Sequence, residues 1–140
     1  MLLSCIISFY YSQIILSQAT ITTLSQKSNY FISPDSYGLT WISSVDGVNV
    51  YNGRDVRVYR PGSYFMVGNN VQSHFYEDCA HDIWFSTYNA LHHYIREKDN
   101  FKIYQFRDEI GKIVDHSYTV LAISEPFLYI RYGDYLGIFD

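Results

Sequence analysis

A repeat of 43 residues is the feature that most constrains how this chain can fold. Residues 35–51 and 78–94 share an acidic residue, a turn, a Trp-led apolar run, a second turn and a closing apolar run. A looser third copy covers residues 128–139. Periods of about 40–50 residues built from short β-type runs are typical of propeller blades. The repeated positions that we assign a structural role are Asp35, Trp41, Tyr51, Asp78, Trp84 and Tyr94.

The composition supports a packed β protein and disfavours a nucleic-acid partner. Aromatic residues make up 19% of the chain, with 15 Tyr, and aromatic side chains suit strands that pack on both faces. The formal charge is −4 with only 10 Lys and Arg, too few for a surface that follows phosphates. No run of like charge predicts a polybasic membrane patch. We therefore expect no binding of nucleic acid by this chain.

The first 19 residues resemble a secretory signal peptide. They carry no charged side chain, contain a short apolar run and end in the small-x-small sequence Ser17-Gln18-Ala19. A buried first strand or a short membrane anchor is the alternative reading. We predict a signal peptide over 1–19 with cleavage after Ala19, a polar leader over 20–29, and a periplasmic or extracytoplasmic location. Cys5 would leave with the signal, so Cys79 would have no disulfide partner.

Eleven short strands are predicted after the leader, in three consecutive antiparallel meanders of four, four and three strands. Asp46-Gly47 and Asn52-Gly53 predict tight hairpins in the first meander. We predict a first blade over 30–62, a second over 69–107 and a partial third over 117–140. The predicted strands are 30–33, 39–44, 48–51, 56–59, 71–77, 83–87, 91–95, 101–106, 118–123, 127–132 and 135–139.

The strands carry bulky apolar side chains on both faces, as in Leu39-Thr40-Trp41-Ile42. A sheet with one face in water would alternate apolar and polar residues, so these sheets must be covered on both sides. We therefore predict an all-β fold, a partial β-propeller of two complete four-stranded antiparallel blades and an incomplete third. A segment with open blade faces is also expected to be poorly soluble or oligomeric by itself.

The middle repeat carries Asn69, Val71, Ser73, Glu77, Asp78, Asp82, Trp84, Thr87, Leu91 and Tyr94. With these residues it resembles the two-component regulator propeller repeat. The likeness covers residues 30–139. The first repeat matches the family pattern at Gly38 and Gly47, where the second repeat has His81 and Ala90 instead. The third copy lacks both the Trp and the leading Asp. The resemblance implies an extracytoplasmic sensor region in which many blades precede a membrane helix and a kinase or DNA-binding output.

The histidines do not have the spacing of a metal site. Adjacent strand residues such as His92 and His93 point to opposite faces and cannot hold one ion together. We therefore predict no metal and no cofactor, and expect the histidines to face solvent or lie at blade edges. The residues considered were His74, His81, His92, His93 and His116 with Glu77, Asp78 and Asp82.

No catalytic motif is present, so no catalytic residue is assigned and the chain is not predicted to be an enzyme. There is no nucleophile elbow or phosphate loop, and Cys79 has no activating partner nearby in the sequence. Asp35 and Asp78 recur once per repeat, which indicates a turn or interblade hydrogen bond rather than catalysis. Tyr64-Phe65 and Tyr135 could stack on a sugar, but we favour a place in the core for them.

Two classes of function remain. The first is an extracytoplasmic ligand-sensing or scaffold segment of a signal-transduction receptor, without its output domain. The second is a fragment of a propeller enzyme acting on glycans, with catalytic residues in other blades. The expected partners are the remaining blades of a longer receptor, a small-molecule or oligosaccharide ligand whose binding residues the sequence does not identify, and a second copy in a receptor homodimer.

Overall fold

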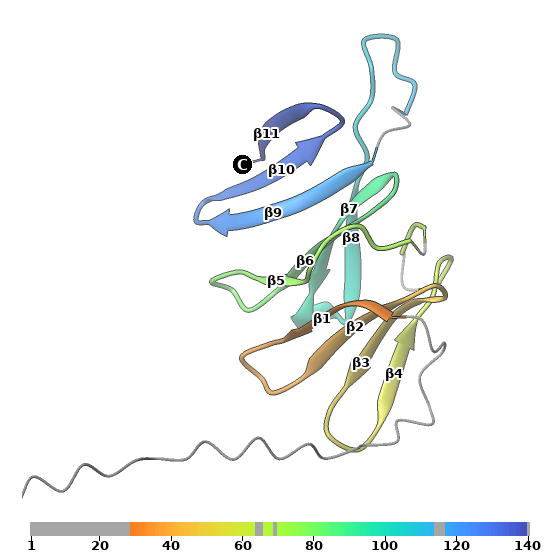
Figure 1. Cartoon of the computed structure of the whole chain (residues 1–140), viewed down its shortest axis with the longest axis vertical. Helices are drawn as coiled ribbons and strands as arrows, with labels where there is room; N and C mark the ends of the chain where they lie inside the picture. The colour runs from red at the N-terminus through yellow and green to blue at the C-terminus, as the bar shows by residue number, and fades with distance from the viewer. Residues whose placement is uncertain (1–28, 64–65, 69, 114–116, 140) are drawn as a thin grey trace, which may run out of the picture.

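Three antiparallel sheets of four, four and three strands make up the chain, which confirms the all-β prediction. The structure is a computed structural model that describes residues 29–63, 66–68, 70–113 and 117–139. The sheets lie one above the other like successive propeller blades (Figure 1). The predicted signal peptide, nearly all of the leader, Tyr64-Phe65 and His116 lie outside the described residues.

Sheet 1 is a meander in the order β1-β2-β3-β4. Its strands are β1 (Asn29–Pro34), β2 (Thr40–Ser44), β3 (Gly47–Tyr51) and β4 (Val56–Tyr59). The β2–β3 hairpin is tight, as the sequence predicts, but its loop is Val45-Asp46 and Gly47 pairs with Ser44 as the first residue of β3. Gly47 is needed there for space, because a Cβ would lie 2.1 Å from the Tyr59 carbonyl oxygen.

Sheet 2 repeats this meander in the order β5-β6-β7-β8. Its first strand is much shorter than the predicted 71–77. In that segment only the Val71–Thr87 bridge and the pairings of the two β5 residues with β6 remain. The reason is that the Ser86 N–H donates to the Ser73 side-chain Oγ instead of to a backbone carbonyl. The strands are β5 (Tyr76–Glu77), β6 (Ile83–Thr87), β7 (Ala90–Ile95) and β8 (Asn100–Tyr104), with a 3-10 turn η1 (Arg96–Lys98) before β8.

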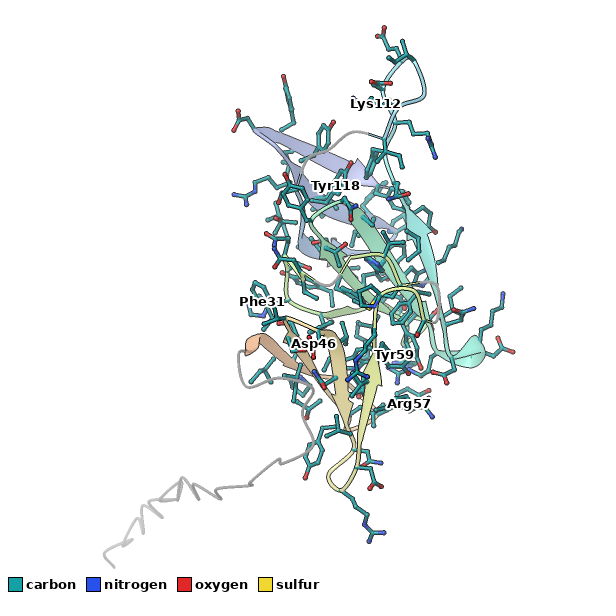
Figure 2. All side chains as sticks on the ribbon, turned by 90° about the vertical axis from the view of Figure 1, so that its right-hand side faces the viewer. Phe31, Asp46, Arg57, Tyr59, Lys112 and Tyr118 are labelled. Carbon is teal, nitrogen blue, oxygen red and sulfur yellow. The ribbon has the colours of Figure 1, made fainter. Side chains whose placement is uncertain are left out.

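Sheet 3 has three strands in the order β11-β10-β9. They are β9 (Tyr118–Ser124), β10 (Phe127–Tyr132) and β11 (Tyr135–Phe139). The segment between β8 and β9 projects from the sheets, with Lys112 near its tip (Figures 1 and 2). In the part of the chain described, no helix is long and apolar enough to cross a membrane.

Sheet 2 is the middle layer and is covered on both faces, as the sequence predicts. Alternate residues of β6 divide between the two layers: Ile83 and Phe85 enter the core shared with sheet 1, whereas Trp84 packs toward sheet 3. The core between sheets 1 and 2 is mainly aromatic, and Tyr59 lies within it (Figure 2). Burial of this apolar area is the main force that holds the layers together.

Candidate functional site

The repeated acidic residue holds a turn and an indole in place. In sheet 1, Asp35 Oδ1 accepts hydrogen bonds from the backbone N–H groups of Tyr37 and Leu39, at 3.0 and 2.8 Å. Its Oδ2 accepts the indole N–H of Trp41 at 2.9 Å. One carboxylate therefore closes the β1–β2 turn and fixes the Trp that fills the core.

Asp78 makes the same contacts in sheet 2. Its Oδ1 accepts the N–H groups of Ala80 and Asp82 at 3.0 and 2.9 Å, and its Oδ2 accepts the Trp84 indole at 2.8 Å. The Asp–Trp pair thus has one structural role in both repeats. This explains why an acidic residue and a Trp six positions later recur together.

A third turn of this kind lies at Asp108, which the sequence interpretation missed. Asp108 Oδ1 accepts the N–H groups of Ile110 and Lys112 at 3.1 and 2.9 Å. The signal was an Asp-x-x-Gly run, Asp108 to Gly111, as at Asp35 to Gly38. It stands 30 positions after Asp78 rather than 43 or 45, so a search by period passes over it.

The two repeated tyrosines have different environments. Tyr51 is partly exposed and donates to the Gly53 carbonyl at 2.6 Å, within its own hairpin. Tyr94 is buried between sheets 1 and 2, and its hydroxyl donates to Asp99 Oδ1 at 2.9 Å. The repeat therefore keeps the residue type at this position while its contacts differ.

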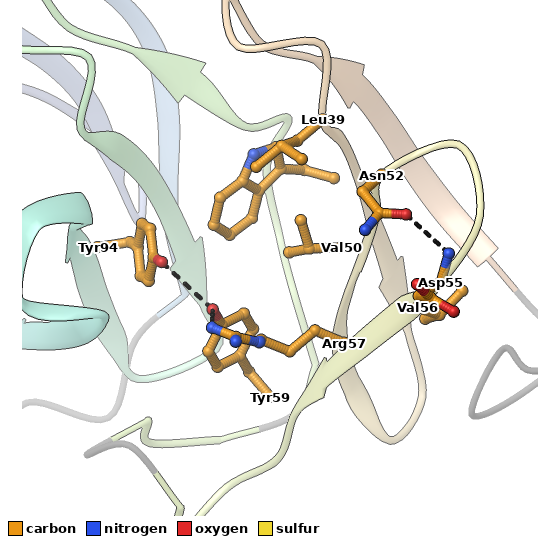
Figure 3. A pocket seen from close by; sticks show the side chains of 9 residues that line it. Leu39, Val50, Asn52, Asp55, Val56, Arg57, Tyr59 and Tyr94 are labelled. Atoms are coloured by element: carbon orange, nitrogen blue, oxygen red, sulfur yellow. Dashed lines mark hydrogen bonds between the residues drawn. The ribbon is translucent and has the colours of Figure 1, made fainter.

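A pocket of about 490 Å³ opens beside β2, β3 and β4 of sheet 1 (Figure 3). Trp41, Val50 and the tyrosines Tyr59 and Tyr94 form its apolar wall. Trp41 and Tyr59 are only 1% and 2% exposed, so their rings are not open platforms for stacking. Polar groups are supplied by the β3–β4 turn and by β4, namely by Asn52, Asp55 and Arg57.

A charged hydrogen-bond network fixes one side of this pocket. Tyr59 and Tyr94 both donate to Asp99 Oδ1, at 2.7 and 2.9 Å, and Arg57 Nη1 lies 2.6 Å from Asp99 Oδ2. Burial raises the pKa of both phenols, so they stay neutral donors. Burial also disfavours the Asp99 carboxylate, but the hydrogen bonds from Tyr59 and Tyr94 outweigh it and lower the pKa of Asp99. The sequence interpretation assigned no role to Arg57, Tyr59 or Asp99.

Ser36, Glu77 and His81 lie together between sheets 1 and 2 and have the residue types of a hydrolase triad. Ser36 Oγ lies 3.0 Å from His81 Nδ1, and Glu77 Oε1 lies 2.9 Å from the same nitrogen. Ser36 also donates to Glu77 through its hydroxyl and its backbone N–H. A proton relay needs the nucleophile and the acid on different ring nitrogens. This trio therefore links two sheets and does not activate Ser36.

The histidines do not all lie where the sequence predicts. His74 and His81 are exposed, and His92 and His93 point to opposite faces of β7 as expected. The expectation of a solvent-facing or edge position is wrong for His92, which is 0% exposed and stacks on Phe85. The reason is that β7 lies inside sheet 2, between β6 and β8, with sheet 1 packed over this face. The expectation is also wrong for His93, whose side chain stacks on Trp84 and is 17% exposed.

Three metal-ligating side chains come together on the other face of β7, although the sequence predicted no metal. Donor atoms of Asp78, Asp82 and His93 all lie within 4.8 Å of one another. Sequence spacing excludes a site made of the histidines alone, but it does not bring His93 near the two aspartates. It could not place β7 opposite the turn that starts at Asp78.

Cys79 and Tyr135 are both exposed. The nearby Glu125 carboxylate raises the pKa of the Cys79 thiol, which disfavours the thiolate needed for a nucleophile. Tyr135 is 73% exposed in β11, so the preferred reading of this residue as core is wrong. Its strand is an edge of sheet 3, where one side has no neighbouring strand among the described residues.

Two solved structures share this fold. One is the extracellular domain of a B. thetaiotaomicron protein described as a hybrid two-component system, with 23% identity and a TM-score of 0.61. The other is the extracellular domain of a B. thetaiotaomicron protein described as a one-component system, with 20% identity and a TM-score of 0.64. The matches cover 76% and 79% of this chain but only 16% of each neighbour. No family model and no curated protein matches the sequence.

Proposed function

We propose that this chain forms part of the extracytoplasmic ligand-sensing region of a signal-transduction receptor. The observation that carries the proposal is the sheet architecture, which is shared with two extracellular domains of bacterial signalling proteins. The resemblance of residues 69–94 to the two-component regulator propeller repeat supports the same assignment. In this proposal the three sheets are blades that cooperate with the remaining blades of a longer receptor, which acts as a homodimer.

The pocket beside sheet 1 is the proposed ligand site. An amide, a carboxylate and a guanidinium at its rim supply both donors and acceptors, at Asn52, Asp55 and Arg57. A saccharide needs both kinds of partner for its hydroxyl groups. The ligand is therefore proposed to be a small oligosaccharide or a similarly polar small molecule.

Calorimetric titration of the full chain with a panel of neutral and acidic oligosaccharides tests this site. We expect binding by one class of sugar and a loss of at least about tenfold in affinity for Asp55→Asn and Arg57→Gln, because each removes a charged hydrogen bond. Asp134→Asn and Arg131→Gln are matched controls in the exposed part of sheet 3. Equal affinity in all four variants would exclude this pocket as the site.

Export is tested separately. Mass spectrometry of the protein from the periplasmic or secreted fraction should find an N-terminus that begins at Thr20, after cleavage behind Ala19. Recovery of a chain that retains Met1 from the cytoplasmic fraction alone would contradict the proposed location. The sugar titration and the export assay have different readouts, so the two parts of the proposal can fail independently.

A further inference from the structure

Asp78, Asp82 and His93 form a compact group on the face of sheet 2 that is turned toward sheet 3. Their donor atoms lie within 4.8 Å of one another, and none of the three lines the pocket of sheet 1. Their side chains are 13%, 16% and 17% exposed, so the group is largely enclosed yet reachable from solvent. Two carboxylates and an imidazole are ligands that divalent transition metals accept.

Local structure holds each of these side chains in place. Asp78 and Asp82 are the first and last residues of one turn, joined by the Asp78 N–H to the Asp82 carbonyl at 3.0 Å. His93 lies opposite Trp84 in the β6–β7 ladder, and the two rings are stacked with centroids 4.0 Å apart. Such a group needs little rearrangement to bind an ion, which favours binding.

Hydrogen bonds to the other atoms orient the two carboxylates. Asp82 Oδ1 accepts the Arg96 N–H at 2.8 Å, which leaves Oδ2 directed at His93. Asp78 Oδ2 accepts one hydrogen bond from the Trp84 indole, and a carboxylate oxygen has a second lone pair. Outer partners of this kind are the usual support of metal ligands.

The distances between the donors fit a tetrahedral ion. His93 Nε2 lies 3.2 Å from Asp82 Oδ2 and 3.7 Å from Asp78 Oδ2. Ligands at about 2.1 Å from zinc in tetrahedral geometry are about 3.4 Å apart. His93 Nε2 is buried and lies close to both carboxylate oxygens.

The repeat shows that the fold does not require these donors. Sheet 1 has the same turn and the same Trp, yet Leu39 stands in the place of Asp82 and Val50 in the place of His93. The pairing is equivalent too, because Trp41 faces Val50 as Trp84 faces His93. In sheet 1 these positions are the apolar wall of a pocket. In sheet 2 the same positions carry two additional metal-ligating groups.

We propose that sheet 2 binds one divalent transition-metal ion of the Zn²⁺ class through Asp78 Oδ2, Asp82 Oδ2 and His93 Nε2. The two carboxylates balance the charge of the ion, and three protein ligands leave a fourth position for water or an external donor. The ion would join the Asp78 turn to β7 at the junction of sheets 2 and 3. This site is independent of the ligand pocket proposed above.

The test is a titration of the tag-free full chain, stripped with EDTA, by ZnCl₂ in a calorimeter and by CoCl₂ with visible absorption. We expect one equivalent of Zn²⁺, intense d–d bands of four-coordinate Co²⁺, and a raised melting temperature with Zn²⁺. Ca²⁺ should not compete. The double variant Asp82→Leu, His93→Val introduces the residues that sheet 1 has at these positions. It should bind Zn²⁺ at least about 100-fold more weakly than the parent, a larger loss than removal of one hydrogen-bond partner of a ligand usually causes.

Two single variants distinguish a loss of metal ligands from a loss of folding. Asp82→Asn keeps the size of the side chain and the acceptor for the Arg96 N–H but should still weaken Zn²⁺ binding. His74→Val removes an exposed histidine outside the group and should leave binding unchanged. The proposal is overturned if the chain takes up no stoichiometric Zn²⁺, if Ca²⁺ binds equally well, or if the double variant binds Zn²⁺ like the parent while its circular dichroism is native.

Discussion

Two adjacent histidines show how completely the environment decides what a residue does. His92 and His93 are neighbours on β7, but one enters the core with sheet 1 and the other faces sheet 3. His92 accepts the Val67 N–H through Nε2 at 3.1 Å and packs on the rings of Phe85 and Phe101. Burial lowers the pKa of His92 to about 4, so the folded protein keeps it neutral.

Acidification should therefore destabilise the protein through His92. Between pH 6.5, the ordinary pKa of histidine, and about 4, the unfolded chain binds a proton at this residue and the folded chain does not. The free energy of unfolding should fall across this window by up to about 3 kcal/mol from this group. Urea unfolding in EDTA at several pH values measures it. His92→Gln should flatten the profile, whereas the exposed control His74→Gln should not; parallel profiles for all three proteins would contradict the assignment.

At the scale of elements, the hairpins depend on backbone space as well as on turn conformation. Gly47 has φ +134° and lies so close to β4 that a Cβ would be 2.1 Å from the Tyr59 carbonyl oxygen. Gly53 also has a positive φ, +93°, but nothing lies within 4 Å of its Cβ position. Comparison of substitutions at these two glycines therefore distinguishes the cost of a positive φ from the cost of steric overlap within one sheet.

Gly47→Ala should destabilise sheet 1 far more than Gly53→Ala. A positive φ alone costs about 1 kcal/mol, whereas displacement of the β4 backbone should bring the loss at Gly47 to about 3 kcal/mol or more. Thermal and urea unfolding of the two variants beside the parent measure the difference. Equal losses would show that β4 moves freely and that the close approach has no energetic consequence.

At the scale of the whole molecule, a buried ion pair connects sheets 1 and 2 in addition to their aromatic core. Arg96 Nη2 lies 2.9 Å from Asp35 Oδ2, and the Asp35 side chain is 1% exposed. The guanidinium also covers the Tyr37 ring, 4.4 Å from its centroid. Burial by itself raises the pKa of Asp35, but hydrogen bonds from Trp41 and Arg96 outweigh it and lower the pKa.

Arg96→Met should therefore weaken the whole assembly. The substitution leaves the Asp35 carboxylate buried without its cation, and removal of one partner of a buried pair costs about 3 kcal/mol. Arg54→Met is the matched control, since Arg54 is exposed on the β3–β4 turn. Urea unfolding should show a lower midpoint for Arg96→Met alone. A change no larger than that of the control would mean that water replaces the guanidinium at Asp35.

The outward face of sheet 3 predicts self-association. Leu136 and Ile138 are 69% and 63% exposed on the edge strand β11, next to a backbone edge open to pairing. We expect concentration-dependent oligomers in size-exclusion chromatography with light scattering, and fewer of them for Leu136→Lys, Ile138→Lys. Ile110→Lys is the control, because Ile110 is 86% exposed in a loop rather than on an edge. A monomer at all concentrations for the parent chain would contradict this expectation.

The repeat period by itself determined the class of the fold and the order of its strands. Recurrence of Asp35 and Trp41 after 43 residues, with the looser copy at 128–139, predicts three meanders, and most strand ends follow from the turns between apolar runs. These features depend on pairings between residues close in the sequence, such as Ser44 with Gly47 and Asn29 with Ser44, and a local pattern records them. The shortened β5 was not predictable in this way, because a Ser73 side chain replaces a backbone partner there.

Tertiary structure alone decided which sheet covers which face and which distant side chains meet. The alternation of side chains along a strand predicts that His92 and His93 point to opposite faces. It does not predict that His92 contacts Phe85 and that His93 lies near Asp82. The Arg96–Asp35 pair spans 61 positions, and the two residues come together only when sheet 2 packs on sheet 1. Local sequence sets the direction of a side chain within its own strand, whereas its burial, charge partner and chemistry depend on the neighbouring layer.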